Sequence, residues 1–174
     1  VGFNSLYKSI FVAYRGSENI VNWINNMKMT FVYPYDIEIY KDIGIQKGFY
    51  TTYSNVYDEV MDAVSSASKK YDVNDVILSG HSLGSISSIL ALDIHIYKPS
   101  LNVISVATFG SPRFGNDAFN DMLAKLNMSI YRITHNNDIV PHVLPYIFGY
   151  RHSINQLWFN NDNSAYIICN GVED

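Results

Sequence analysis

The sequence predicts an α/β fold in which helices cover both faces of a mostly parallel β-sheet. Short apolar runs, rich in β-branched and aromatic residues, alternate along the chain with longer segments of helical periodicity. This alternation is typical of parallel sheets, because the crossover between two parallel strands usually carries a helix. A length of 174 residues, of which 48% are hydrophobic, fits one domain over 1–174 with a sizeable core.

The spacing of apolar residues assigns each segment in turn. Short continuous apolar runs indicate buried strands, and apolar residues that recur every three or four positions indicate the buried face of a helix. The expected elements are a strand over 9–14, a helix over 48–71, a strand over 76–78, a helix over 83–97, a strand over 103–109, a helix around 119–126, a strand over 129–134 and a hairpin formed by 154–159 and 165–169.

Composition and motif content exclude several classes of function. The formal net charge is −4, and no block of Lys or Arg indicates a nucleic-acid partner. No run of 18 apolar residues predicts a transmembrane helix. The sequence contains no zinc-ligand spacing, no P-loop and no Gly-x-Gly-x-x-Gly, so we expect neither a metal nor a cofactor.

A Gly-x-Ser-x-Gly sequence joins the expected strand at 76–78 to the expected helix at 83–97. It reads Gly80-His81-Ser82-Leu83-Gly84. A nucleophilic serine at such a junction needs small residues on both sides, because the strand and helix backbones approach closely there. The helix N-terminus, beginning with the Leu83 amide, can stabilise an oxyanion. This context favours Ser82 as a nucleophile, and the alternative is a serine that only caps the helix.

A serine nucleophile needs a base and an acid that orients the base, and on this kind of sheet both follow the serine along the chain. Asp138 lies in the loop after the expected strand 129–134, where such an acid belongs. The alternatives are that Asp138 is a solvated loop residue, or that the acid is Asp117 or Asp121 at a helix start. Ser17, just after the first strand, is either a second oxyanion donor or an ordinary turn residue.

Six segments in order along the chain resemble the fungal-type class 3 lipase family, which includes the Rhizomucor-type triacylglycerol lipases. They are Y-R-G-S…N-W-I (14–24), Q-K-G-F (46–49), G-H-S-L-G (80–84), T-F-G-S-P-R-F-G-N (108–116), D-I-V-P-H (138–142) and F-G-Y-R-H (148–152) with the residues after it. The resemblance covers most of the chain and implies an α/β-hydrolase fold. It implies Ser82 as nucleophile, Asp138 as the acid of a Ser-His-Asp triad, and Ser17 with the Leu83 amide as the oxyanion hole.

The resemblance also implies a function and a location. It implies a carboxylic ester hydrolase that acts on acylglycerols, needs no cofactor and is secreted. Phospholipase A1 and feruloyl-type esterase activities share the same motifs, and a lipase-like interaction domain with impaired catalysis is a further alternative. A vacuolar or cytosolic location stays open as well.

No segment of this sequence matches the family segment that carries the catalytic histidine. In the family it lies in an Asp-His-x-x-Tyr segment after the equivalent of Cys169, and that cysteine pairs with another further on. We therefore expect both beyond Asp174, in a chain that is cut at both ends. Of the five histidines present, chain order leaves His152 as the only substitute base, and its alternative is a structural role.

Residues 18–29 predict a short amphipathic helix. Its apolar side consists of Ile20, Val21, Trp23, Ile24 and Met27. Ordinary core packing is the usual role of such a stripe. The position directly after the candidate oxyanion loop favours instead a lid that shields the site in water and lays its apolar face on a lipid interface.

If residues 18–29 are a lid, the double substitution Ile20→Ser and Ile24→Ser should reduce activity on emulsified lipid more than on a soluble ester. The reason is that only the emulsified substrate requires the apolar face to bind an interface. The two rates are compared for the variant and the unchanged protein. Equal losses on both substrates would contradict the lid.

Overall fold

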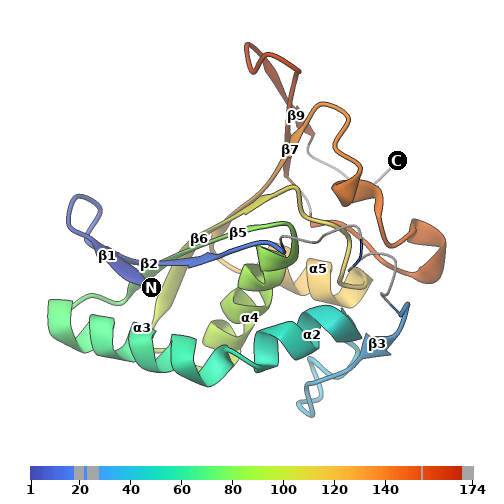
Figure 1. Ribbon diagram of the computed structural model, residues 1–174. Helices are drawn as coiled ribbons and strands as arrows, with labels where there is room; N and C mark the ends of the chain where they lie inside the picture. The colour runs from blue at the N-terminus through green and yellow to red at the C-terminus, as the bar shows by residue number, and fades with distance from the viewer. Residues whose placement is uncertain (18–21, 23–27, 154, 170–174) are drawn as a thin grey trace.

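A seven-stranded sheet forms the centre of the computed structural model, which describes residues 1–17, 22, 28–153 and 155–169 (Figure 1). Its strands, in order across the sheet, are β1 (Gly2–Asn4), β2 (Ser9–Tyr14), β5 (Asp75–His81), β6 (Asn102–Phe109), β7 (Ser129–His135), β8 (Gln156–Phe159) and β9 (Tyr166–Cys169). The five inner strands are parallel, while β1 and β9 pair antiparallel at the edges. This arrangement confirms the expected α/β class with a mostly parallel sheet, and it confirms the expected hairpin near the end of the chain.

The described helices and turns connect these strands. They are α2 (Lys47–Ser54), α3 (Tyr57–Tyr71), η1 (Ser82–Ile86), α4 (Ser87–Tyr97), α5 (Asp117–Lys125), η2 (Val140–His142) and η3 (Tyr146–Phe148), where η marks a 3₁₀ helix. A small second sheet pairs β3 (Phe31–Val32) with β4 (Ile45–Gln46). Both lie between β2 and α2 in the chain, and Gln46 also begins α2 through a side-chain hydrogen bond to the Phe49 amide.

The structure departs from the expected helix boundaries in two places. The helix expected over 48–71 is divided into α2 and α3, because Val56 has a non-helical φ of −118°. Apolar periodicity continues across this break, so the sequence pattern did not indicate it. The helix expected from Leu83 begins as the 3₁₀ helix η1 and becomes α-helical at Ser87, since the tight junction with β5 narrows its first turns.

The described helices pack against one face of the sheet (Figure 1). Helix α3 contacts β1 and β2, and α4 contacts β2, β5 and β6. Strand residues alternate accordingly: Val76 and Leu78 of β5 are buried against the helices, whereas Phe11 and Phe109 on the other face are 40% and 42% exposed. Within the described ranges, helices therefore cover one face of the sheet, and the expectation of helices on both faces was wrong for this part of the chain. The parallel strands follow one another in a single direction across the sheet, and right-handed crossovers then all lie on the same face.

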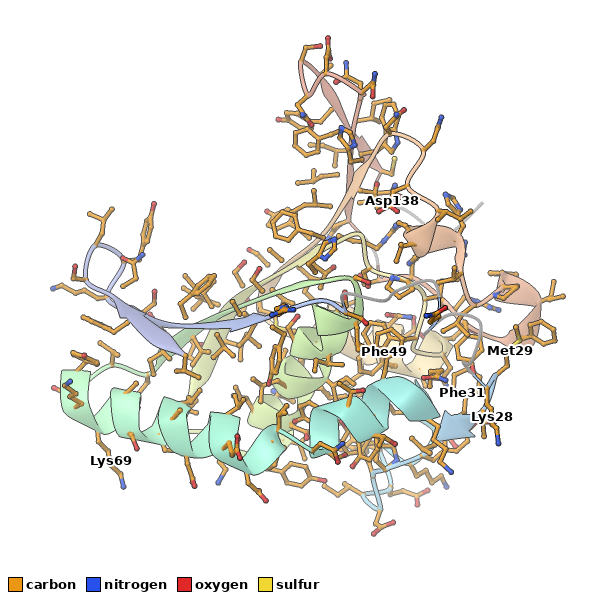
Figure 2. All side chains as sticks on the ribbon, in the orientation of Figure 1. Lys28, Met29, Phe31, Phe49, Lys69 and Asp138 are labelled. Carbon is orange, nitrogen blue, oxygen red and sulfur yellow. The ribbon has the colours of Figure 1, made fainter. Side chains whose placement is uncertain are left out.

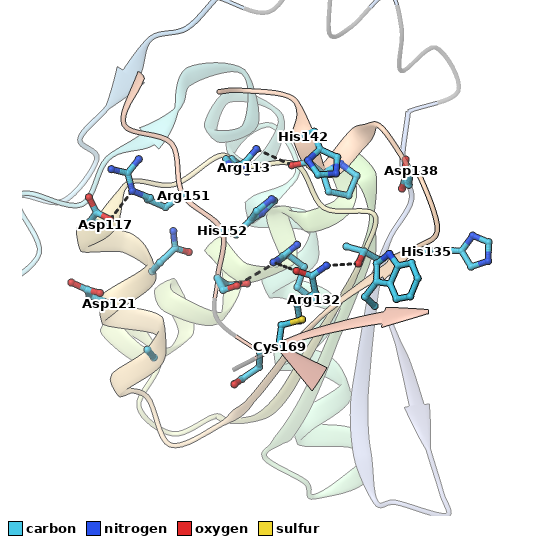
Figure 3. A pocket seen from close by; sticks show the side chains of 18 of the residues that line it. Arg113, Asp117, Asp121, Arg132, His135, Asp138, His142, Arg151, His152 and Cys169 are labelled. Carbon is cyan, nitrogen blue, oxygen red and sulfur yellow. Dashed lines mark hydrogen bonds and ion pairs between the residues drawn. The ribbon is translucent and has the colours of Figure 1, made fainter. Parts of the chain in front are cut away.

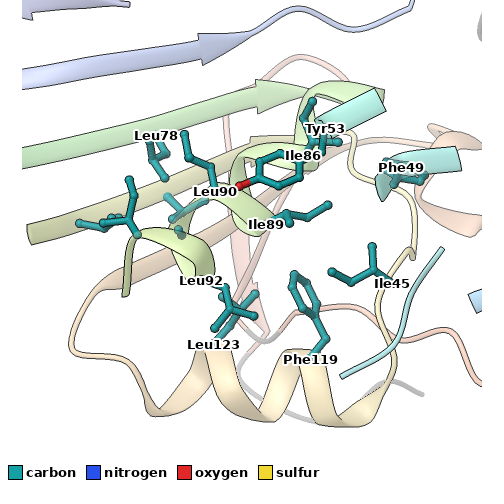
Figure 4. Packing of buried hydrophobic residues seen from close by; sticks show 14 of the residues in the cluster. Ile45, Phe49, Tyr53, Leu78, Ile86, Ile89, Leu90, Leu92, Phe119 and Leu123 are labelled. Atoms are coloured by element: carbon teal, nitrogen blue, oxygen red, sulfur yellow. The ribbon is translucent and has the colours of Figure 1, made fainter. Parts of the chain in front are cut away.

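Helix α4 lies at the centre of the core. Every residue from Ser87 to Ile94 is buried, and Figure 4 shows Ile89, Leu90 and Leu92 between the sheet and the side chains of Phe119 and Leu123 from α5. A helix that is buried on nearly all sides cannot rotate or slide without opening cavities in its surroundings. The elbow that leads into α4 is thereby held in a fixed place.

One carboxylate lies inside this core. Asp93 of α4 is only 8% exposed, and its two oxygens accept hydrogen bonds from the hydroxyl groups of Tyr35 (2.7 Å) and Tyr53 (2.6 Å). Burial raises the pKa of Asp93, and the hydrogen bonds from Tyr53 and Tyr35 offset part of that rise. These bonds join α4 to the end of α2 and to the irregular segment between β3 and β4.

The substitution Asp93→Asn should change how stability depends on pH. Because the pKa of Asp93 is raised in the folded state, its contribution is present below the unfolded pKa and is lost as the pH rises through the folded pKa. The asparagine variant lacks this loss, so its free energy of unfolding relative to the unchanged protein should increase from pH 4 towards neutral pH. Urea denaturation at several pH values measures the difference.

The matched control for this measurement is Asp62→Asn, because Asp62 is an exposed carboxylate on α3. It should shift the unfolding free energy by less than about 0.5 kcal/mol at every pH. A stability difference for Asp93→Asn that stays constant across the same pH range would contradict the raised pKa.

Candidate active site

The backbone at the carboxyl end of β5 turns sharply into η1, and Ser82 occupies the turn. Ser82 has a φ of +54°, a left-handed conformation that is uncommon and strained for a residue other than glycine. Two glycines make the turn possible. A Cβ atom on Gly80 would overlap the carbonyl group of Gly84, and a Cβ atom on Gly84 would overlap the carbonyl oxygen of Tyr14. The elbow predicted from the sequence thus has the close packing that its glycines suggested.

The Ser82 side chain lies inside this packing. The residue is 2% exposed, and its Oγ has no hydrogen-bond partner among the described residues. A buried hydroxyl without a partner is costly in a folded protein, and such groups cluster at functional sites. The position of Ser82 therefore points to a chemical role more than to helix capping, in which Oγ would accept a backbone N–H bond.

The loop after β2 lies directly against the elbow. A Cβ atom on Gly16 would stand 2.7 Å from His81 Nδ1 and 3.3 Å from Ser82 Cβ, so only a glycine permits this approach. Ser17 follows Gly16 in the chain, and Leu83 follows Ser82 in η1. The structure places the loop that carries Ser17 next to the elbow, and the assignment of Ser82, Ser17 and Leu83 to a nucleophile and an oxyanion hole stays a prediction.

Asp138 lies at the same edge of the sheet, in the loop after β7 (Figure 2). Its Oδ1 accepts a hydrogen bond from the Val140 amide (3.0 Å), which orients the carboxylate. Gly110, with a φ of +54°, ends the neighbouring strand β6, and a Cβ atom there would stand 2.8 Å from Asp138 Oδ2 and 3.7 Å from His81 Nε2. The carboxylate thus lies over the end of β6, on the side of the elbow.

The two alternative acids lie elsewhere. Asp117, at the start of α5, forms an ion pair with Arg151 (Nε–Oδ1 3.0 Å), and Asp121 is an exposed residue one turn further along α5. Both side chains line a polar cavity beside the helix (Figure 3). Since Asp138 lies at the carboxyl ends of the strands with Ser82, the geometry favours Asp138 over these two residues as the acid.

A cavity of about 420 Å³, lined mainly by charged and polar side chains, adjoins Asp138 (Figure 3). Asp138, Arg113, Arg132 and His152 line it, and Ser82 does not. Burial and the positive charges of Arg132 and Arg113 hold the pKa of His152 well below its usual range. A general base must accept a proton during the reaction, and this surrounding opposes a positive charge on the His152 ring.

Sequence reasoning missed two residues of this site. Gly16 and Gly110 let the loop after β2 and the Asp138 carboxylate approach the elbow, and the His81 ring lies close to both. The available signal was the glycine that directly follows a predicted strand in each case, within Y-R-G-S and T-F-G-S. A glycine at a strand end has many other uses, so the contact could not be assigned from the sequence alone.

The candidate lid residues Ile20, Val21, Trp23, Ile24 and Met27 lie outside the described residues. The chain after them is described from Lys28, which lies with Met29 and Phe31 near Phe49 at the start of α2 (Figure 2). The Lys28 carbonyl accepts a hydrogen bond from the buried side chain of Gln46 (2.7 Å).

Comparison with known proteins gives consistent matches. A family model for "Lipase (class 3)" matches residues 11–148. The "Secreted mono- and diacylglycerol lipase 1" of Fusarium solani is 30% identical over 186 residues, which cover 98% of this chain and 54% of that protein. A lipase of Rhizomucor miehei is 34% identical over 160 residues, covering 90% and 43% of the two chains. The solved structure of lipase II from Rhizopus niveus matches 98% of this chain and 64% of its own, with a TM-score of 0.87 at 28% identity.

The matches cover only part of each relative. The chain spans about half the length of the curated relatives it matches.

The elbow geometry predicts that Gly80→Ala strongly destabilises the protein. The added Cβ would overlap the Gly84 carbonyl group, which is backbone and cannot move without separating β5 from η1. We expect the free energy of unfolding to fall by at least about 3 kcal/mol. The control is Gly2→Ala, where a Cβ would have no neighbour within 4 Å. Equal stability of the two variants in chemical denaturation would contradict the packing described for the elbow.

Proposed function

The chain belongs to the class 3 lipase family, and we propose that it hydrolyses carboxylic esters of acylglycerols through an acyl-enzyme on Ser82. The observation that carries this proposal is the strained, buried Ser82 with an unpartnered Oγ, placed between the Ser17 loop and the η1 amides. Among the relatives, one acts on mono- and diacylglycerols by its name, and the others are named as lipases.

The proposed reaction has two halves. Ser82 Oγ attacks the ester carbonyl carbon and gives its proton to a histidine, and the carbonyl oxygen becomes an oxyanion held by Ser17 and the Leu83 amide. The tetrahedral intermediate collapses, the histidine returns the proton to the leaving alcohol, and the acyl group stays on Ser82. Water then attacks the acyl-enzyme by the same route and releases the fatty acid.

Asp138 is the proposed partner of that histidine. Its carboxylate is oriented by the Val140 amide and faces the elbow across the end of β6, where it can hold an imidazole in the correct tautomer and stabilise the imidazolium. The histidine itself is proposed from the family resemblance. His152 is a poorer candidate, because the arginines beside it oppose its protonation.

The substrate class implies a lipid interface as partner. We propose that residues 18–29 cover the site in water and contact the lipid during turnover, as their amphipathic sequence indicates. No helix within the described ranges is long and apolar enough to cross a membrane. We also propose that the protein is secreted, in agreement with the name of the Fusarium relative.

A fluorophosphonate probe tests the nucleophile directly. The probe should form one adduct at Ser82, located by mass spectrometry, and Ser82→Ala should abolish both the adduct and the hydrolysis of a soluble ester. Ser66→Ala, which changes an exposed serine on α3, should keep both. Asp138→Asn should lower the hydrolysis rate by about 10³–10⁴-fold, whereas Asp121→Asn should leave it within about twofold.

The same measurements separate the alternatives. Labelling at Ser82 with hydrolysis of phospholipids or feruloyl esters, and none of acylglycerols, would keep the mechanism and change the substrate. A folded protein with neither adduct nor ester hydrolysis would contradict the enzymatic function and favour an interaction domain.

A further inference from the structure

Two tyrosines bind the buried carboxylate of Asp93 beneath the elbow. Tyr35 and Tyr53 each donate a hydrogen bond to one Asp93 oxygen, at 2.7 Å and 2.6 Å. Both rings are buried, and each packs edge-on against another tyrosine, Tyr40 or Tyr57. Figure 4 shows Tyr53 close to Ile86 and Leu90, in the first turns after the elbow.

A third tyrosine comes from the strand before the candidate oxyanion loop. The Tyr14 hydroxyl is buried and has no hydrogen-bond partner in the described part of the chain. Burial raises the pKa of Tyr14, and the charge of Asp93 adds to this rise. A carboxylate can accept about four hydrogen bonds, so Asp93 has acceptor capacity beyond its two tyrosine bonds.

The stability of the core alone does not explain why a carboxylate lies at position 93. Among the described residues, no cation forms an ion pair with Asp93, and burial is the largest influence on its pKa. Burying a carboxylate costs more than burying an apolar side chain of similar size. A leucine in the middle of α4 would fill the core at lower cost, so the retained carboxylate indicates a need for directed contacts.

The contacts around Asp93 connect the segments on both sides of Ser82. Asp93 belongs to α4, which continues from η1 and its Leu83 amide. Tyr53 belongs to α2, which contacts η1. The Tyr14 backbone packs against Gly84 so closely that a Cβ on Gly84 would overlap the Tyr14 carbonyl oxygen, and the chain then runs through Gly16 to Ser17.

We propose that Asp93, with Tyr35, Tyr53 and Tyr14, forms a positioning cluster that sets the distance between the two halves of the oxyanion hole, the Ser17 loop and the Leu83 amide. The proposal rests on the proposed ester hydrolysis. No member of the cluster contacts the substrate; its effect is transmitted through α2, η1 and the Tyr14 backbone.

The expected signature is a loss of kcat without a change in KM. In Tyr53→Phe and Asp93→Leu, one or both hydrogen bonds are lost and α2 can shift against η1. Removing an oxyanion donor costs about 10²–10³ in kcat, and misplacing one should cost about 10–100-fold. KM for a soluble ester should stay within about twofold, because ester binding itself does not use the cluster.

A conservative variant should rescue the function. The Asp93→Asn amide can accept a hydrogen bond from one tyrosine and donate one to the other, so kcat should stay within about threefold of the unchanged protein. Tyr40→Phe is the matched control: it removes a hydroxyl from a buried tyrosine that contacts Tyr35 by its ring and has no side-chain hydrogen bond among the described residues. Its kcat should be unchanged.

A second measurement does not depend on turnover. Amide hydrogen exchange at Gly16, Ser17, Leu83 and Gly84 should accelerate in Tyr53→Phe and stay unchanged in Tyr40→Phe, with circular dichroism confirming that both variants are folded. Tyr53→Phe removes one oxygen atom and carries the test if Asp93→Leu does not fold.

Three results would overturn the cluster: unchanged kcat and exchange in Tyr53→Phe, equal losses in Tyr53→Phe and Tyr40→Phe, or a loss in Asp93→Asn as large as in Asp93→Leu. Failure of the proposed function would give different experimental results. An unchanged protein that neither hydrolyses esters nor reacts with a fluorophosphonate contradicts the ester hydrolysis, and the exchange data then decide whether the cluster orders the two loops.

Discussion

The close approach of three backbone segments at the end of β5 is the constraint on which the rest of the site depends. Gly80 packs against Gly84, and Gly84 packs against the Tyr14 carbonyl group. This contact leaves no room for side chains, and it forces Ser82 into a left-handed conformation that costs about 1–3 kcal/mol. The strain is tolerated because β5 is hydrogen-bonded on both sides and α4 is buried along most of its length. The nucleophile candidate is therefore held by the core, and the surface loops are placed against it.

The need to hold the elbow in a fixed place also explains why polar groups lie under it. An apolar core fixes distances only through shape, whereas a carboxylate with two tyrosine donors fixes directions as well. The Asp93 hydrogen bonds connect residues that are 58 and 40 positions apart in the chain. They tie the irregular segment after β3 and the end of α2 to one helix. Burying the Asp93 carboxylate costs free energy, but its hydrogen bonds fix the geometry at the point where the two sides of the elbow meet.

How far the sequence predicted this molecule depends on the range of the interactions involved. The strand over 9–14 matched β2 at both ends, because a short apolar run bounded by a polar turn is a local signal. The break at Val56 and the 3₁₀ turns of η1 were missed, since the apolar periodicity continues across both. For the site, the Gly-x-Ser-x-Gly elbow and the chain order predicted Ser82, Ser17 and Asp138 as candidates. The contacts of Gly16, Gly110 and Asp93 could not be predicted, because nothing local to these residues indicates their partners.

The strand order itself supplies the spacing that a triad needs. Ser82 follows β5 and Asp138 follows β7, with β6 between them in parallel register. Neighbouring strands lie about 4.8 Å apart, so the two strand ends are separated by about 10 Å. An imidazole with a hydrogen bond of about 2.8 Å at each nitrogen spans about 7–8 Å, and the Ser and Asp side chains can cover the remaining distance. The ends of two neighbouring strands would be too close together to hold the ring between them. The ends of strands that are three positions apart in the sheet would be too far from each other. The intervening strand ends in Gly110, where a side chain would collide with the Asp138 carboxylate. For the proposed triad, the sheet thus favours the loop after β7 as the one that carries the acid, over Asp117 and Asp121 on α5.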